Sequence, residues 1–251
     1  MSIVLILLLN LAVGACIGLT GIAGFLLPMF YTGFLGMPAA ESLALSFSAF
    51  LISGVLGTVN YYKAGNLAVR PAAVLSAGSL LGALAGVCIN LLIPEDVMQI
   101  ILYAVVLVSG ISILLRRGGK ESADAGTAVL STGRMAFYFL LGIVTGAVCA
   151  ASGAGGPVLV MPLLTLLGFP AHTAVGMSLF NSVFIALPAA AGYLWHASDN
   201  REMFLLLVPV LTAHGIGVTW GSRNAEKINQ NLLKRIVAVG SIGIALFKLF
   251  V

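Results

Sequence analysis

The sequence is poor in charged residues. Only 8% of its 251 residues are Asp, Glu, Lys or Arg, whereas 60% are hydrophobic, and the mean hydropathy is +1.12. A soluble domain needs more polar surface than this to cover its core. The composition therefore excludes an ordinary soluble domain and predicts an integral membrane protein. The net charge of +4 lies in predicted loops, where it sets orientation in the membrane and does not indicate nucleic-acid binding.

The sequence is also poor in cysteine and in the residue clusters that carry enzyme chemistry. Its three cysteines, Cys16, Cys88 and Cys149, lie in apolar segments, and this odd number without a loop partner predicts no structural disulfide. It has neither a cluster of metal ligands nor a nucleophile beside a base, so we expect no enzyme, no metal and no cofactor. The first residues lack the basic region of a cleaved signal peptide, so they are predicted to remain as part of the first helix.

Apolar runs of about 20 residues, the length that crosses a bilayer, make up most of the chain. Because lipid offers the backbone no hydrogen-bond partners, such runs must be helices, and we predict an all-α, polytopic membrane protein. The predicted simple spans cover residues 39–62, 71–92, 97–115, 171–195, 203–221 and 232–250. Two further apolar regions, 3–35 and 134–167, are each interrupted by a glycine-rich break, at 20–24 and at 150–162.

The two halves of the chain resemble each other at an offset of 132 residues. The offset pairs glycine, proline, serine and tyrosine positions without a gap: 14 with 146, 21 with 153, 24 with 156, 36 with 168, 38 with 170, 46 with 178 and 61 with 193. We predict two homologous repeats, residues 1–117 and 134–251, joined by a cytoplasmic linker at 118–133. Each repeat has a broken helix followed by three transmembrane helices. Paired broken segments indicate a transporter's binding site.

The basic residues indicate how the repeats are oriented. The 34 residues from Ile3 to Gly36 would form about 51 Å of helix, too long for one straight crossing of roughly 30 Å. If each broken region is re-entrant, the repeats are inverted, and ten Lys and Arg residues fall on one side with only Arg201 among the opposite loops. Eight simple crossings would split them seven to four. The positive-inside rule favours inverted repeats with both termini outside, and kinked single crossings are the alternative.

The breaks predict the sign of the substrate. A helix that starts within the membrane presents free N–H groups and the positive end of its dipole, which together form an anion site without a cationic side chain. Serine hydroxyls and the Asn181 amide in the following helices would add donors, and a buried Asn181 needs a partner. The candidate substrate-binding residues are Thr20, Gly21, Gly24, Ser46, Ser48, Ser152, Gly153, Gly155, Gly156, Ser178 and Asn181.

Structural explanations for these residues stay open at this point. Glycines also let helices kink or pack closely, and serines bond their own backbone. No Asp, Glu, Lys or Arg lies centrally in a predicted span, which leaves His214 as the one ionisable candidate for proton coupling. Gly78, Gly82 and Gly86 share one helix face, which predicts close packing either within the chain or between two copies in a homodimer.

With these motifs the chain resembles the sulfite exporter TauE/SafE family of anion transporters over nearly its whole length. The family's repeated motif is best matched by residues 152–156 (Ser-Gly-Ala-Gly-Gly), by Pro162 and by residues 168–170 (Gly-Phe-Pro). The first copy departs from it, since Phe25 replaces Pro157. The resemblance implies transport of sulfite, sulfonates or related sulfur-containing anions across the cytoplasmic membrane of a prokaryote.

The sequence therefore predicts a multi-pass permease or exporter that binds a small sulfur-containing oxyanion at the repeat interface. Its expected partners are the lipid bilayer and a small anion, with no nucleic acid. An anion channel, a transporter of another small organic anion, and a membrane-embedded assembly or sensor protein are the alternatives.

Overall fold

The computed structural model describes residues 3–21, 23–94, 132–197 and 201–227, together with single positions between residues 97 and 111 and between 239 and 246. Within this part of the chain the regular structure is entirely helical. The helices are α1 (Ile3–Thr20), the 3-10 helix η1 (Ala23–Phe25), α2 (Leu26–Gly33), α3 (Ala39–Lys63), α4 (Val69–Leu92), α6 (Thr132–Ser152), α7 (Gly156–Leu166), α8 (Ala171–His196) and α9 (Arg201–Arg223).

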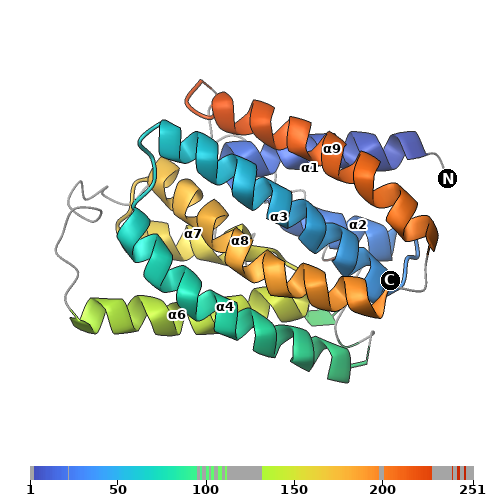
Figure 1. The fold of residues 1–251 in the computed structure, drawn as a ribbon, viewed down its shortest axis with the longest axis horizontal. Helices are drawn as coiled ribbons and strands as arrows, with labels where there is room; N and C mark the ends of the chain where they lie inside the picture. Colours follow the sequence, from blue (N-terminus) through green and yellow to red (C-terminus); the bar gives the residue numbers. More distant parts are fainter. Residues whose placement is uncertain are drawn as a thin grey trace.

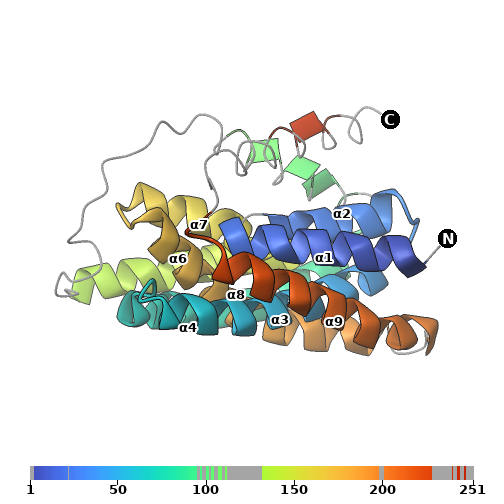
Figure 2. The same cartoon turned by 90° about the horizontal axis from the view of Figure 1, so that it is seen from above.

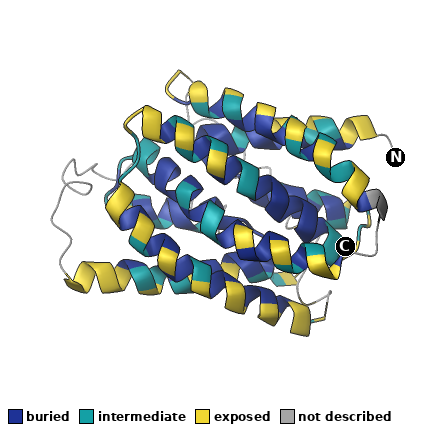
Figure 3. Cartoon of the chain, in the orientation of Figure 1, coloured by how far each residue is buried: buried dark blue, intermediate teal, exposed yellow. Residues whose placement is uncertain are grey.

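Six helices are long and apolar enough to cross a membrane: α1, α3, α4, α6, α8 and most of α9. The prediction of an all-α, polytopic membrane protein is therefore confirmed. Buried residues face the interior of the bundle, and exposed ones lie on its outer faces, as expected for helices in lipid (Figure 3). The predicted spans at 97–115 and 232–250 and the linker at 118–133 lie mostly outside the described residues.

The central helices α3 and α8 pack against each other and are flanked by two outer pairs, α1 with α9 and α4 with α6 (Figure 1). Figure 2 shows the same bundle from above, with the short helices α2 and α7 in the layer behind α3 and α8. Each short helix packs on the central helix that follows it, α2 on α3 and α7 on α8. This arrangement is what a twofold exchange of the two halves would produce.

Equivalent helices of the two halves run in opposite directions. In Figure 1, α1 and α3 start at the right end of the bundle, whereas α6 and α8 start at the left end. Within the first half the chain also turns back at its break, because the Asn10 amide donates to the Tyr31 hydroxyl at 2.6 Å. In one continuous helix these two residues would be about 30 Å apart. The inverted repeat stays a prediction, which these directions support.

Hydrogen bonds recur at the same offset. The Tyr61 hydroxyl donates to the Gly18 carbonyl at 3.0 Å, and the Tyr193 hydroxyl donates to the Ala150 carbonyl at 2.9 Å. Both partners are shifted by 132 residues, so each tyrosine ties a central helix to the last turn of the broken helix in its own half. The repeat boundaries at 117 and 134 are not tested by these contacts.

Glycines bring the outer helix pairs into backbone contact. A side chain at Gly78, Gly82 or Gly86 of α4 would collide with carbonyl groups of α6. Gly217 and Gly221 of α9 meet the backbone of α1 in the same way. The glycine face at 78–86 therefore packs within the chain, which resolves the alternative left open by the sequence, and the homodimer loses this argument.

Candidate functional site

Both breaks use glycine in a backbone conformation that other residues rarely adopt. The φ angle is +72° at Gly21 and at Gly153, and +77° at Gly155. A Cβ is strained in this region, so glycine is needed there. The N–H of Gly21 donates to the Ile17 carbonyl at 2.8 Å, and that of Gly153 donates to the Cys149 carbonyl at 3.0 Å. The chain thus leaves its helix by the same turn in both halves.

The two breaks meet beside α3 and α8, near the middle of both helices. A Cβ on Gly21 would lie 3.3 Å from the Ser178 hydroxyl oxygen, and one on Gly24 would lie 3.7 Å from the Ala154 carbonyl oxygen. Gly21 and Gly24 belong to the first half, whereas Ser178 and Ala154 belong to the second. The structure therefore brings these predicted site residues together across the two halves.

The second break leads into a helix that starts abruptly. Helix α7 begins at Gly156, and its first N–H groups have no acceptor within the helix. Among the described residues, the N–H groups of Gly155 and Gly156 have no hydrogen-bond acceptor. The N–H of Gly153 is used by its own helix, and that of Ala154 points to the Ser152 hydroxyl oxygen at 3.3 Å. The backbone donors left for an anion are therefore Gly155, Gly156 and the following residues of the first turn.

The first break leads into its helix more gradually. The 3-10 helix η1 precedes α2, and Phe25 already has helical φ and ψ angles of −60° and −17°. The residue equivalent to Phe25 in the second half is Pro157. The first half therefore lacks the abrupt helix start that exposes N–H groups in α7.

Most of the predicted hydroxyl donors are already bonded to their own helices. The bonds run from Thr20 to the Cys16 carbonyl, from Ser48 to Ala44, from Ser152 to Val148 and from Ser178 to Val175, at 2.7–2.8 Å. A hydroxyl has a single hydrogen to donate. In this conformation these four groups can accept a hydrogen bond but have no hydrogen left for an anion.

Ser46 and Asn181 differ from the other polar candidates. Both side chains are fully buried, and among the described residues the Ser46 hydroxyl and both polar atoms of the Asn181 amide have no hydrogen-bond partner. A buried polar group left unpaired costs about 1–3 kcal/mol. Asn181 lies one turn from Ser178 on the α8 face that meets the breaks, since Ser182 of the same face contacts Gly156.

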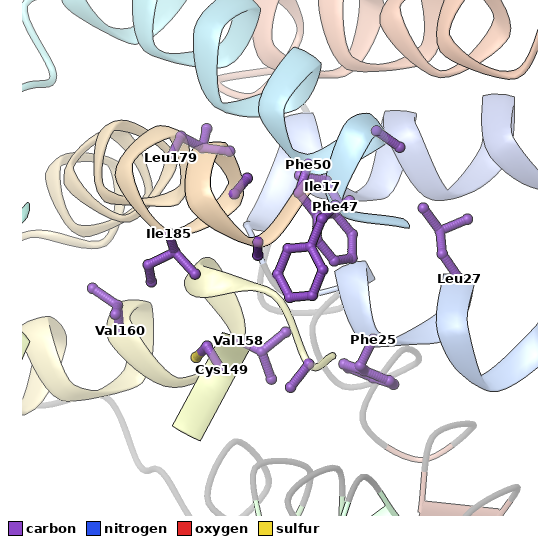
Figure 4. Close-up of a cluster of buried hydrophobic side chains, with 14 of the residues drawn as sticks. Ile17, Phe25, Leu27, Phe47, Phe50, Cys149, Val158, Val160, Leu179 and Ile185 are labelled. Atoms are coloured by element: carbon purple, nitrogen blue, oxygen red, sulfur yellow. The ribbon is translucent and has the colours of Figure 1, made fainter. Parts of the chain in front are cut away.

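Sequence reasoning missed Phe50. A Cβ at Gly24 or at Gly155 would each lie 3.1 Å from the Phe50 ring, so the ring fills the space between the two breaks. Figure 4 shows Phe50 beside Phe47 at the centre of the buried cluster, and the two rings lie edge to face with centroids 5.5 Å apart. The repeat offset contains a signal, because position 50 corresponds to Ser182.

His214 lies in a different polar contact. Its Nε2 is 3.0 Å from the Ser53 hydroxyl, which is also 2.9 Å from the Ala49 carbonyl oxygen. The imidazole is fully buried between α9 and α3. These contacts connect the histidine to the central helix α3, and none of them involves a glycine of the breaks.

Charge and metal ligands are absent from the buried interior that the structure describes. None of its buried polar residues is Asp, Glu, Lys or Arg, and the described residues contain no group of ligands suited to a metal ion. An anion at the breaks would therefore be held by helix dipoles, N–H groups and neutral side chains.

Comparison with known proteins identifies the family. A sequence model of the family described as sulfite exporter TauE/SafE matches residues 6–247. A protein of Methanocaldococcus jannaschii described as a probable membrane transporter protein is 25% identical over 100 residues, which make up 38% of this chain and 36% of that relative. The chain thus aligns with little more than a third of the relative's length. No solved structure matches the chain. The chain is a multi-pass membrane transporter and belongs to the sulfite exporter TauE/SafE family.

Proposed function

We propose that the protein carries a small sulfur-containing oxyanion or a sulfonate, such as sulfite, across the cytoplasmic membrane as a permease or exporter. The observation that carries this proposal is that Asn181 and Ser46 are fully buried beside the breaks without a partner among the described residues. A substrate with several oxygen atoms would accept bonds from the amide, the hydroxyl and the free N–H groups of Gly155 and Gly156. The family's description as sulfite exporters supports the choice of anion.

A site without a cation suits a transporter, because the substrate must also be released. A helix terminus stabilises a nearby charge by about 0.3–1 kcal/mol at the surface and by up to roughly 2 kcal/mol when partly buried. Together with several hydrogen bonds this supports affinities in the micromolar to millimolar range. The remaining glycines, Gly21, Gly24 and Gly153, shape the breaks in this proposal and keep the backbone accessible.

Transport requires the Phe50 ring to leave its position between the breaks. The ring contacts the backbone at Gly155, next to the free N–H groups, so we take the described conformation as one in which the site is closed. Two inverted halves can exchange their packing around a fixed central site, which would open it to each side in turn. In this mechanism Phe50 moves with α3 when the halves rearrange.

Uptake into liposomes that contain the purified protein tests the substrate. We expect labelled sulfite to be transported and small sulfonates to compete with it, whereas acetate and cations of similar size should not compete. Transport of acetate in preference to every sulfur-containing anion would replace the proposed substrate by another small organic anion. Absence of any anion flux would leave only an assembly or sensor role.

The same liposomes separate a transporter from an anion channel. A coupled transporter accumulates sulfite against its gradient, whereas a channel only equilibrates it. Running the assay with and without a pH gradient tests His214, whose role as a coupling residue stays an alternative to a structural bond with Ser53. Accumulation that follows the pH gradient and is lost in His214→Gln would assign the coupling to this residue.

A further inference from the structure

A pocket of about 330 Å³ opens at the end of the bundle where α3 and α9 finish and α8 begins. Its lining is mostly polar and includes two cations, Lys63 and Arg223. The other polar residues that line it are Asn60, Asn66, His172 and Ser222, together with Glu226. In Figure 1 this is the left end of α3, α8 and α9. We call this feature the basic pocket.

The two cations of the basic pocket keep their charge exposed to it. Lys63 and Arg223 are both exposed, and neither forms a salt bridge with any of the described residues. The one carboxylate in the lining, Glu226, accepts a hydrogen bond from the Asn66 amide at 3.2 Å. His172 is the second residue of α8, so the positive end of that helix dipole also faces the pocket. The pocket therefore has an excess of positive charge.

The floor of the basic pocket lies over the first break. Tyr61 lines the pocket, and its hydroxyl donates to the carbonyl groups of Gly18 at 3.0 Å and Leu19 at 3.4 Å. These carbonyls belong to the last turn of α1, directly before Thr20 and Gly21. Tyr61 is therefore the side chain that separates the pocket from the break.

The opposite end of the molecule shows that the fold does not need these charges. At the repeat offset, Lys63 corresponds to Trp195 and Asn60 to Gly192. There, Gly192 packs against the apolar side chain of Val87. Tyr193 makes the same bond as Tyr61, so the tyrosine is common to both ends, whereas the cations occur at one end only.

We infer that the basic pocket is a binding site for small inorganic or organic oxyanions, which collects them for passage to the breaks when Tyr61 moves aside. This inference rests on the proposed function for the destination of the anion, but the binding itself does not. Positively charged clefts concentrate anions and accelerate their association. By the distribution of basic residues, this end of the protein is the cytoplasmic one.

Cysteine labelling of the purified protein tests the pocket without any transport measurement. Ala64→Cys places a thiol in the lining at an exposed position, and Cys88→Ser removes the exposed native thiol. We expect Ala64→Cys to react at least about fivefold faster with an anionic methanethiosulfonate than with a cationic one, after normalisation to free cysteine. The preference should disappear in Lys63→Gln/Arg223→Gln and in high salt.

Two controls make the outcome decisive. His196→Cys is the equivalent exposed position of the second half and should show no preference for the anionic reagent. Arg70→Gln/Arg134→Gln removes the same charge from exposed positions that do not line the pocket, and it should leave the preference intact. An equal preference at Ala64→Cys and His196→Cys, or one that survives the loss of Lys63 and Arg223, would overturn the inference.

Sulfite uptake separates this inference from the proposed function. With sulfite supplied on the pocket side, Lys63→Gln/Arg223→Gln should raise the half-saturating concentration about fivefold and leave the maximal rate unchanged. No such change should occur with sulfite on the opposite side. A pocket that prefers anions in a protein without sulfite flux would refute only the proposed function, whereas flux with unchanged half-saturation would refute only the role of the pocket.

Discussion

The two glycine breaks end their first helices with the same hydrogen bonds but have different neighbours at their centres. Gly24 faces the Phe50 ring, whereas the equivalent Gly156 faces the backbone of Ser182. The second break leads into α7 with free N–H groups, and the first leads into α2 through a 3-10 turn. A duplicated scaffold has thus kept its backbone in both halves, while one half supplies the anion donors and the other supplies the ring that covers them.

The largest effect is expected from a side chain at the second break. A Cβ at Gly156 would lie 3.0 Å from Ile185 and 3.1 Å from Ser182, so Gly156→Leu has to push α7 away from α8. We expect sulfite uptake in liposomes to fall at least about a hundredfold, because the free N–H groups lose their position. Gly133→Leu, at a glycine with open space around it, is the control. Normal flux through a correctly inserted Gly156→Leu protein would remove the second break from the site.

The next effect concerns Asn181. Asn181→Leu should weaken sulfite binding measured by calorimetry about tenfold to hundredfold, which corresponds to about 1–3 kcal/mol for the lost bonds. Its thermal stability without substrate should not fall, since the amide has no partner to lose. Asn90→Leu should behave in the opposite way, because the Asn90 amide donates to the Ala151 carbonyl at 2.6 Å. Lower stability with unchanged binding in Asn181→Leu would show that the amide is structural.

Exchanging the residues that face the two breaks tests their division of labour. Ser182→Phe should reduce sulfite uptake about tenfold, because a second ring would cover Gly156. Phe50→Leu should increase uptake up to about fivefold, if the loss of the ring shifts the closed state by about 1 kcal/mol. Equal effects of both replacements on uptake would mean that the halves have the same role.

The smallest effect should be the same in both halves. Tyr61→Phe and Tyr193→Phe each remove one hydroxyl bond to the last turn of a broken helix, and each should lower the free energy of unfolding by about 0.5–1.5 kcal/mol. Tyr62→Phe, at an exposed neighbour, should have no effect. Denaturation of the purified variants measures the difference. Unequal losses from Tyr61→Phe and Tyr193→Phe would show that the two ends are not structurally equivalent.

Much of the architecture follows from local patterns in the sequence. Apolar length fixes the helices, and glycines at 21, 153 and 155 fix the breaks, because only short stretches of backbone decide hydropathy and φ. The predicted span at 171–195 agrees with α8 at Ala171–His196. The repeat offset also predicts which helices correspond, since a duplication keeps its spacing.

The state of each polar group at the breaks could not be read from the sequence. Thr20, Ser48, Ser152 and Ser178 resemble Ser46 in composition and context, yet their hydroxyls are committed to carbonyls of their own helices, whereas Ser46 is not. Whether a serine finds an acceptor depends on its rotamer and on what packs against it. Those neighbours come from distant parts of the chain.

The sequence by itself determined that this protein is helical, spans a membrane, breaks two of its helices and favours an anion, because lipid and backbone chemistry impose these features locally. Only the tertiary structure decided that Phe50 lies between the breaks, that Asn181 has no partner among the described residues, and that Lys63 and Arg223 line one pocket. The residues concerned are far apart along the chain, and Lys63 and Arg223 are separated by 160 positions. Their proximity results from the packing of α3, α8 and α9, which no local pattern encodes.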